Sequence, residues 1–367
     1  MTSTADVLGQ RVLNQWLLGS TAASGAEVVR WMGAVQAQDY GAAKWALAQR
    51  APSLTSASID AELAAGRILR THILRPTWHF VVPEDIRWML ALSAARTRKA
   101  ARMGLRQSAI SSAVLADATG VIVEALSGQG RLTRAELRAR VDQAGVHVAD
   151  GVAFGRVLHA AEIDGLICSG GLRGKQHTYA LLEEIVPPVP ARSHDAALGE
   201  LATRYFAGHG PATRDDFRWW SGLLAAEVRT AMETAEPRLD TVESEGQRYW
   251  RCGPPPNGPH NAPSRDRRVA RLLPNFDEYT VGYAERSALV PGVGTVPADP
   301  FVILGNVLLV DGTIRGTWTR TASRTALVIT ARAFAAMTGS ERAALHASAE
   351  RYGDFLELQA TMRWEVA

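Results

Sequence analysis

The sequence predicts an α+β protein in which groups of helices are each followed by a two-stranded hairpin. Near the N-terminus, three helical runs precede two strand-like runs, at 7–18, 26–35 and 58–65, then at 68–74 and 77–82. A similar succession recurs twice further along the chain, which suggests a repeated supersecondary unit. The C-terminal part instead combines strand-like runs with one long helical run at 339–356.

The first succession has the order of a winged helix, in which helices are followed by a hairpin. Arg75-Pro76 separates the two strand-like runs. Pro83-Glu84-Asp85 then starts another helix, because proline and acids are favoured in a first turn. We assign residues 1–110 to winged helix 1 together with this following helix.

Residues 111–190 predict winged helix 2. Thr133 and Glu136 have the spacing of a capping box, which opens a helix reaching 144. The remaining expected elements are a short helix at 121–126, a helix in the recognition position at 153–164, and strands at 166–168 and 178–182 around a Gly170-Gly171 turn.

Residues 191–255 predict winged helix 3, and residues 256–367 predict a Pro-rich loop and a β-rich cap packed on it. In winged helix 3, Thr213 is an N-cap residue, and the expected helices and strands are 196–207, 213–220, 225–236, 239–242 and 248–251. In the cap, Asp311-Gly312 is a hairpin signal, and the expected strands are 271–273, 280–283, 302–310 and 315–320.

The composition restricts the class of protein. The chain has 367 residues, 47% of them hydrophobic, and a formal charge of +3, which permits nucleic-acid binding. Its two cysteines argue against a disulfide framework or a zinc site, and its histidines lack metal-ligand spacing. We find no signal peptide and no run of about 20 apolar residues, so we expect a cytoplasmic protein without a membrane span.

The segment Val35-Gln36-Ala37-Gln38-Asp39 is the most informative part of the chain. Alternate side chains of an extended backbone point the same way, so Gln36 and Gln38 would share a face while Ala37 turns toward the core. In a helix the two amides would lie about 200° apart and could not cooperate.

Four segments together resemble the AlkZ/YcaQ-like family of winged-helix DNA glycosylases. These are residues 33–38, 75–80, 217–222 and 273–279. The resemblance implies three tandem winged helices in a C-shaped arrangement, with the glutamines in a basic channel. It implies a monomer that needs no cofactor and excises N7-alkylated purines, including bulky adducts and interstrand crosslinks, from duplex DNA. The Gln-Ala-Gln version is similar to that of the antibiotic self-resistance branch.

Glutamines suit this chemistry because an N7-alkylguanine is cationic and leaves as a neutral base. The enzyme must then place a water near C1′, and an amide can hold one through its carbonyl and NH₂ groups. We expect Gln38 to contact the water or sugar, and Gln36 to do the same or to orient Gln38. Asp39 is a rival that could accept the proton, or it could simply cap a helix starting near Tyr40.

Several polar residues are candidates for supporting catalysis or for contacting DNA. Arg75, Thr77 and His79 alternate on one strand face, where they could touch phosphate, line the channel, or be ordinary exposed residues. Lys44 is read as a phosphate contact or a surface residue rather than as a Schiff-base lysine. The other basic candidates are Arg98 and Arg102 on one helix face with Arg106, then Arg173, Lys175 and His177 at a wing tip, and Arg265, Arg267 and Arg268 in the Pro-rich loop.

Two further motifs leave structural roles open. Phe276 and Asp277 match the family but suit a buried structural role equally well, and Trp219 and Trp220 are expected in the core. Besides a monofunctional glycosylase, two alternatives remain: a non-enzymatic winged-helix regulator and a protein that sequesters a drug without cutting anything. Neither a phosphate-binding GxxxxGK[ST] loop nor a Gly-x-Ser-x-Gly elbow is present.

Overall fold

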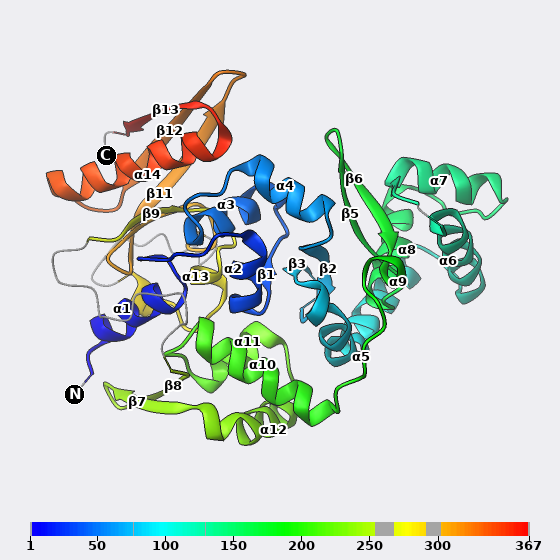
Figure 1. The fold of residues 1–367 in the computed structure, drawn as a ribbon, viewed down its shortest axis with the longest axis horizontal. Coiled ribbons are helices and arrows are strands. Elements are labelled where there is room, and N and C mark those ends of the chain that lie inside the picture. The colour runs from blue at the N-terminus through cyan, green and yellow to red at the C-terminus, as the bar shows by residue number, and fades with distance from the viewer. Residues whose placement is uncertain (1, 76, 129, 254–267, 291–301, 366–367) are drawn as a thin grey trace. The chain divides into compact units, whose positions relative to one another are not determined.

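The computed structural model describes residues 2–365 except 76, 129, 254–267 and 291–301. The chain divides into two compact units. One combines Met1–Ile59 with Leu198–Ala367 and is called the terminal unit here, and the other, Asp60–Ala197, is called the central unit. Both units mix helices and strands, as Figure 1 shows, so the expected α+β class is confirmed.

The N-terminal part of the terminal unit carries the glutamine segment. Its elements are α1 (Thr4–Asn14), α2 (Gly25–Met32), β1 (Val35–Gln36) and α3 (Tyr40–Arg50), and α4 (Ser56–Ala64) runs into the central unit. The expected helix through residue 35 is wrong, because α2 ends at Met32 and is capped by Gly33, whose φ of +79° suits glycine. The chain then enters β1 in an extended conformation.

The central unit begins with a hairpin followed by a long helix, as expected. Its elements are β2 (Leu69–Ile73), β3 (Thr77–Val81), α5 (Pro83–Gln107), α6 (Ser112–Leu126), β4 (Leu132–Thr133), α7 (Arg134–Gln143), α8 (Gly151–Ile163), β5 (Ile167–Arg173), β6 (Gln176–Leu181) and α9 (Leu182–Ile185). The capping box is present, since Glu136 N–H donates to Thr133 Oγ1 and Thr133 N–H donates to the Glu136 carboxylate. The helix expected at 121–126 is longer, because Ser111 caps it much earlier.

The second hairpin differs from the expectation in one respect. Gly170 and Gly171 form a bulge inside β5, and the chain turns at Gly174-Lys175 instead. A Cβ on Gly170 would lie 2.7 Å from Thr178 Oγ1, so these glycines allow close backbone approach rather than a turn. The sheet order is β4-β6-β5, and it covers a core made by α6, α7 and α8.

A third succession with the same order spans the boundary and continues in the terminal unit. Its elements are α10 (His194–Gly208), α11 (Arg214–Ser221), α12 (Ala225–Ala235), η1 (Glu236–Arg238), β7 (Asp240–Ser244) and β8 (Gln247–Arg251). Ala212, just before α11, bridges Trp250 of β8. Ala212 therefore takes the place that β4 has in the central unit, beside the second strand of the hairpin.

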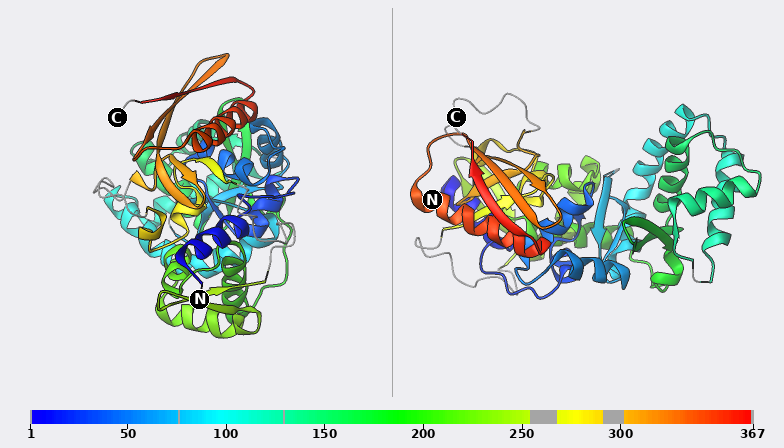
Figure 2. Two further views of the ribbon diagram at one scale, coloured as in Figure 1. Left: turned by 90° about the vertical axis from the view of Figure 1, so that its left-hand side faces the viewer. Right: turned by 90° about the horizontal axis from the view of Figure 1, so that it is seen from above.

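The C-terminal region forms a five-stranded sheet in the order β13-β12-β11-β10-β9. Its elements are β9 (Ala270–Leu273), α13 (Glu278–Val281), η2 (Ser287–Leu289), β10 (Val307–Val310), β11 (Thr313–Ala322), β12 (Ala326–Ala333), α14 (Gly339–Leu356) and β13 (Gln359–Trp364). The strand expected at 280–283 is wrong, since Asp277 caps a short helix there. The Asp311-Gly312 hairpin and the last helix are confirmed, and α14 joins β12 to its parallel neighbour β13 (Figure 2).

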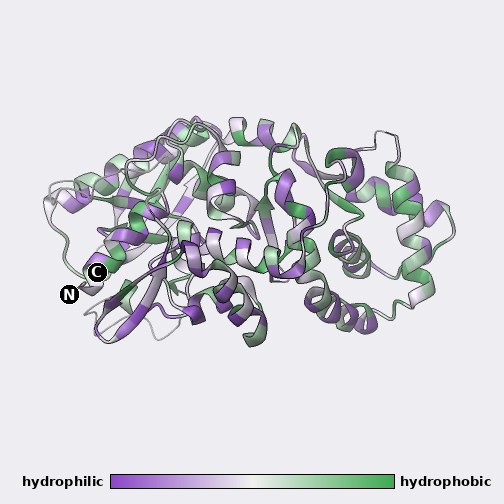
Figure 3. Cartoon of the chain, turned by 60° about the horizontal axis from the view of Figure 1, so that its bottom comes forward, coloured by the Kyte–Doolittle hydropathy of each residue, from purple (hydrophilic) through white to green (hydrophobic). Residues whose placement is uncertain are grey.

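The cap packs on more than the third helical group. Trp45 and Gln49 of α3 both donate to the Leu272 carbonyl at 2.7 Å, and α1 shares a core with β9 and β10. Figure 3 shows hydrophobic and hydrophilic residues alternating around most helices, as expected for helices with one buried face. In the described part of the chain no single helix is long and apolar enough to cross a membrane; only α5 and α6 taken together pass such a test, and they are bent by 108°.

Candidate active site

Gln36 and Gln38 lie where the chain leaves β1, outside any helix, as the sequence predicted. Ala37 is fully buried, which confirms that it turns toward the core. Gln36 is also buried, with 8% of its surface exposed, whereas Gln38 is exposed. The two amides therefore have different surroundings. That they meet on one ligand stays a prediction.

The backbone of Gln36 is held by a buried acid. Gln36 N–H donates to Glu278 Oε1 at 2.7 Å, and Glu278 is fully buried. The other carboxylate oxygen accepts from Trp220 Nε1 at 3.0 Å and lies 3.1 Å from His209 Nε2. A buried carboxylate must be satisfied in this way, because an unpaired charge away from water is strongly destabilising.

Aromatic rings enclose this carboxylate. His209 is fully buried and stacks on Tyr205 with ring centroids 4.7 Å apart, and Trp220 lies against both rings. Burial raises the pKa of the Tyr205 phenol well above its ordinary value, with Asp216 adding to the effect. Tyr205 therefore remains a neutral donor, and its hydroxyl donates to the Gly282 carbonyl at 2.8 Å.

The residue before Glu278 makes a second buried contact with the N-terminal helices. Asp277 accepts from both terminal nitrogens of Arg50, at 2.8 and 2.9 Å, and both side chains are almost fully buried. Burial alone would lower the pKa of Arg50, but Asp277 together with Glu278 and Tyr283 more than offsets it, so the pKa is raised. Asp277 also caps α13 through Tyr279 N–H. The buried structural role left open for Asp277 is thus present.

Phe276 explains how two adjacent acids reach different partners. Its φ of +60° lies in the left-handed region, which costs an ordinary residue about 1–2 kcal/mol. The turn at Phe276 is fixed by its N–H, which donates to the Leu304 carbonyl at 2.9 Å. Asp277 then faces Arg50 and Glu278 faces Gln36.

Asp39 acts as a helix cap, one of its two expected roles. Its Oδ1 accepts from Ala42 N–H at 3.0 Å at the start of α3, and its Oδ2 accepts from Asn275 Nδ2 at 3.4 Å. Both carboxylate oxygens are therefore in use.

Lys44 is not a surface residue, so that part of the expectation is wrong. Its side chain is buried on α3, and Nζ donates to Ser56 Oγ at 2.6 Å. The ammonium also lies 5.1 Å from the centre of the Tyr40 ring. Lys44 faces α4 rather than solvent. The residues next to it in the sequence did not indicate this.

The strand-face residues lie in the central unit, at and just before β3. His79 is fully buried with Nδ1 2.9 Å from the Thr77 carbonyl oxygen, so ordinary exposure is wrong for this residue. Thr77 and Arg75 are half-buried. Arg75 lies in the turn before β3, so only Thr77 and His79 belong to the strand, and the part of the three residues in catalysis or DNA binding stays a prediction.

The basic candidates are placed as follows. Arg98 pairs with Asp164 at 2.6 Å, Arg173 pairs with Glu136 at 2.7 Å, and Arg268 pairs with Asp311 and Glu341 at 3.5 and 3.2 Å. Arg102 is exposed on α5 and Lys175 and His177 are exposed at the β5–β6 turn. Arg265 and Arg267 lie outside the described residues. The acidic partners are distant in sequence, so no local pattern predicts them.

The site contains two residues whose part in it sequence reasoning missed, Glu278 and His209, whereas Trp220 is fully buried as expected. Trp220 and Glu278 belong to segments singled out for the resemblance, 217–222 and 273–279, which meet around the Gln36 backbone. Trp219 departs from expectation, because it is 45% exposed with Arg286 over its ring. A helix of eight residues buries one face only, so adjacent tryptophans cannot both point inward.

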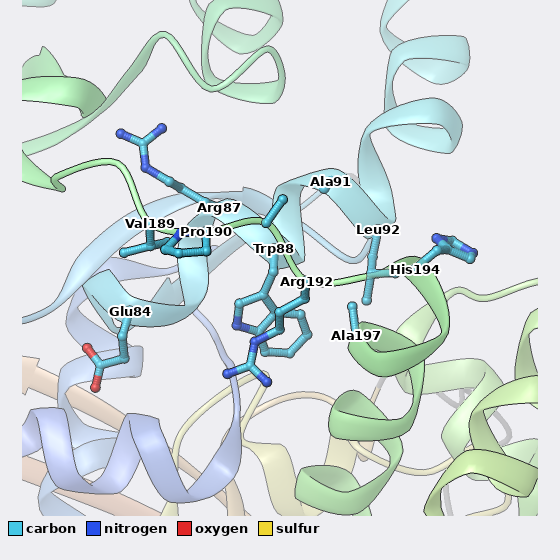
Figure 4. A pocket seen from close by; sticks show the side chains of 11 residues that line it. Glu84, Arg87, Trp88, Ala91, Leu92, Val189, Pro190, Arg192, His194 and Ala197 are labelled. Atoms are coloured by element: carbon cyan, nitrogen blue, oxygen red, sulfur yellow. The ribbon is translucent and has the colours of Figure 1, made fainter.

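Two cavities of similar size lie in the central unit, and neither is lined by Gln36 or Gln38. One, of about 510 Å³, lies between the start of α5 and residues 189–197. Figure 4 shows Trp88 and Arg192 beside each other in it, and the Arg192 guanidinium lies 5.6 Å from the Trp88 ring centre. The other, of about 540 Å³, is bordered by α7, α8 and β6. Among the described residues, no group of three or more His, Cys, Asp or Glu is placed to hold a metal ion.

A family model described as DNA glycosylase AlkZ-like matches residues 29–355, so the chain belongs to the AlkZ-like DNA glycosylase family. The chain is 24% identical over 335 residues to the interstrand DNA cross-link repair glycosylase of Streptomyces sahachiroi, covering 86% of this chain and 87% of that protein.

The fold agrees with this assignment. The structure of the Streptomyces sahachiroi DNA glycosylase AlkZ matches with a TM-score of 0.74, covering 99% of both chains at 22% identity. The family resemblance inferred from the sequence is therefore confirmed, and with it an enzyme that acts on glycosyl bonds in DNA.

Proposed function

We propose that this chain is a monofunctional glycosylase that hydrolyses the N-glycosidic bond of bulky N7-alkylated purines in duplex DNA, and that it unhooks interstrand crosslinks. Support for the crosslink comes from the Streptomyces relative, whose name states that substrate. In the proposed setting, three tandem winged helices hold the DNA, and a cytoplasmic monomer serves repair or self-resistance to a genotoxic natural product.

One observation carries the proposal: a buried carboxylate fixes the backbone beside an exposed amide. Glu278 holds the Gln36 N–H at 2.7 Å, and Gln38, two residues on, is exposed. A fixed backbone limits the positions that the Gln38 amide can take, which is what placing a water requires. Gln38 therefore contacts the water or the sugar, and Gln36 supports its orientation.

The leaving group makes a strong base unnecessary. Loss of a cationic N7-alkylpurine yields a neutral base, so the enzyme must mainly stabilise positive charge on the sugar and place the water. In this scheme Asp39 has a structural role, because its Oδ1 caps α3 and its Oδ2 accepts from Asn275.

Water is the proposed nucleophile because the nearest lysine in sequence is engaged. A lysine that forms a Schiff base must present a free amine, and Lys44 instead donates to Ser56 Oγ from a buried position. The product is then an intact abasic site rather than a nicked strand.

The experiment measures base release from a duplex with one bulky N7-alkylguanine, and from a duplex with an N7-linked interstrand crosslink. Wild type is compared with Gln36→Ala, Gln38→Ala and a control, Gln143→Ala, at an exposed position on α7. We expect wild type and the control to release base and leave an alkali-labile abasic site. Both site variants should lose release while duplex Kd is kept. Binding without release in wild type would favour a regulator or a sequestering protein instead.

A further inference from the structure

The cavity of about 540 Å³ in the central unit has a composition that the glycosylase chemistry does not use. It is bordered by the β2–β3 hairpin, the first turns of α7 and α8, and strand β6. Its described lining combines three guanidinium groups with three aromatic rings and contains no aspartate or glutamate: Arg70, Arg134, Arg138, Trp78, Phe154 and Tyr179. A pocket of this size holds one small organic ligand.

The three arginines are not equivalent. Arg138 is fully engaged, because its Nε faces both Asp142 oxygens at 2.9 Å and its terminal nitrogens donate to the Asp150 and Val148 carbonyls. Asp142 neutralises the charge of Arg138, so Arg138 forms part of the cavity wall without providing a free charge. Arg134, in contrast, donates to the Gly151 carbonyl oxygen and pairs with no described carboxylate.

The sequence makes room for the Arg134 guanidinium against α8. A Cβ on Gly155 would lie 3.0 Å from Arg134 Nη2, and one on Gly151 would lie 3.9 Å from it. Two glycines one turn apart thus let the guanidinium lie along the helix surface. An exposed guanidinium without a described carboxylate partner thus borders the cavity, which suits an anion such as a phosphate.

Arg70 provides a flat surface on the other side of the cavity. Its guanidinium lies 4.2 Å from the centre of the Trp78 ring, and its side chain is nine-tenths buried, so its plane is fixed. Guanidinium planes and aromatic rings are the surfaces on which nucleobases stack. Burial raises the pKa of Tyr179 above its ordinary value, with Glu162 adding to the effect, so this wall adds no negative charge.

We propose that this cavity binds one phosphorylated nucleoside, with the phosphate at Arg134 and the base on the Arg70–Trp78 stack. The nucleotide belongs either to a DNA strand or to the free pool, and both present the same phosphate and base. The site lies in the central unit, whereas Gln36 and Gln38 lie in the terminal unit. The inference does not rest on the proposed lesion chemistry.

The first experiment uses the full chain and titrates dGMP, deoxyguanosine and inorganic phosphate by calorimetry. We compare wild type with Arg134→Gln, with Gly155→Ala, which displaces the guanidinium, and with Arg140→Gln, an exposed arginine on the same helix. We expect saturable dGMP binding that weakens at least tenfold in Arg134→Gln, weakens by a smaller factor in Gly155→Ala, and stays unchanged in Arg140→Gln. Alanine favours a helix over glycine, so loss of folding cannot explain the Gly155→Ala result.

The second experiment distinguishes a nucleotide of a DNA strand from a free nucleotide. Its result is interpreted together with the base-release assay. If the nucleotide belongs to DNA, Arg134→Gln weakens binding to a duplex with one extrahelical nucleotide more than binding to a fully paired duplex. If it comes from the free pool, both duplexes bind Arg134→Gln and wild type alike, while dGMP affinity still falls. Equal binding of dGMP to Arg134→Gln and Arg140→Gln would overturn the proposal, as would phosphate binding as tight as dGMP. Base release that fails in wild type while dGMP binds would refute the proposed function alone.

Discussion

The backbone N–H of Gln36 and the carboxylate of Glu278 are 242 positions apart in sequence and form a 2.7 Å hydrogen bond. The carboxylate also faces Trp220 Nε1 and His209 Nε2. One acid therefore joins the glutamine strand, the third helical group and the C-terminal region.

The substitution Glu278→Gln tests whether this bond serves catalysis. In the variant, the NH₂ group of the new glutamine must face either the Gln36 N–H or Trp220 Nε1. One hydrogen bond to a charged acceptor is then lost, because two donors face each other. Such a bond contributes about 1.5–3 kcal/mol, so we expect base release to fall roughly tenfold to a hundredfold.

Single-turnover kinetics on the alkylated duplex measure this effect, with Glu243→Gln as an exposed control. The Kd for duplex DNA should change little in both variants. If folded Glu278→Gln released base at the wild-type rate, Glu278 would not be needed to position Gln36.

The buried ion pair between Arg50 and Asp277 is predicted to act on stability. Removing one partner leaves a buried charge uncompensated, which costs about 3–5 kcal/mol. Asp277→Ala also removes the cap of α13. We expect a large fall in the free energy of unfolding, measured by urea denaturation.

The matched control is the pair Arg248–Glu243, whose side chains are 60% and 68% exposed. Exposed pairs contribute about 0–1 kcal/mol, so Arg248→Ala should change the free energy of unfolding little. Equal effects of the two substitutions would contradict the assigned role of Asp277.

Two hairpin turns provide a matched test of packing at glycine. Gly312 and Gly246 both follow a residue with positive φ, and their own φ values are +84° and +79°. Alanine at either position costs about 1–2 kcal/mol from the backbone. At Gly312 a Cβ would also lie 3.1 Å from Leu8 Cβ, whereas at Gly246 nothing lies within 4 Å. Thermal unfolding should therefore show a larger loss of Tm for Gly312→Ala than for Gly246→Ala.

His159 predicts a pH dependence of stability in the acid range. Burial, and then the neighbouring His72, lower its pKa from 6.5 to about 4. The unfolded chain therefore binds this proton at a higher pH than the folded chain does, so the contribution to stability is complete above pH 6.5 and is lost as the pH falls toward 4. His159→Gln should flatten the loss of Tm between these values, and His147→Gln, at an exposed position, should not.

Local signals predicted much of the fold. Capping residues at Thr133 and Thr213, the Asp311-Gly312 turn and the helix at 339–356 were read correctly, because each rests on contacts within a few residues. The strands β12 and β13 were missed, and β13 pairs with β12 across helix α14, where pairing between distant segments leaves a weaker local pattern. The Gly170-Gly171 bulge was read as a turn for the same reason: Thr178, which requires it, lies on the opposite strand.

The candidate site was predicted only in part. Residues 36–38 were recognised, with Ala37 correctly placed in the core. The partners of Gln36 were not found, because hydrogen bonds between residues such as Gln36 and Glu278 have no periodicity in the sequence. The burial of Lys44 and His79 likewise depends on packing that a single sequence does not display.

The bond between Gln36 and Glu278 also bears on the order in which the protein is made. The ribosome releases the glutamine strand early, but its acidic partner and the Asp277 that binds Arg50 emerge much later. A nascent chain with the first two helical groups would carry both glutamines without the carboxylate that fixes them. The contacts that hold the Gln36 backbone are thus completed near the end of translation.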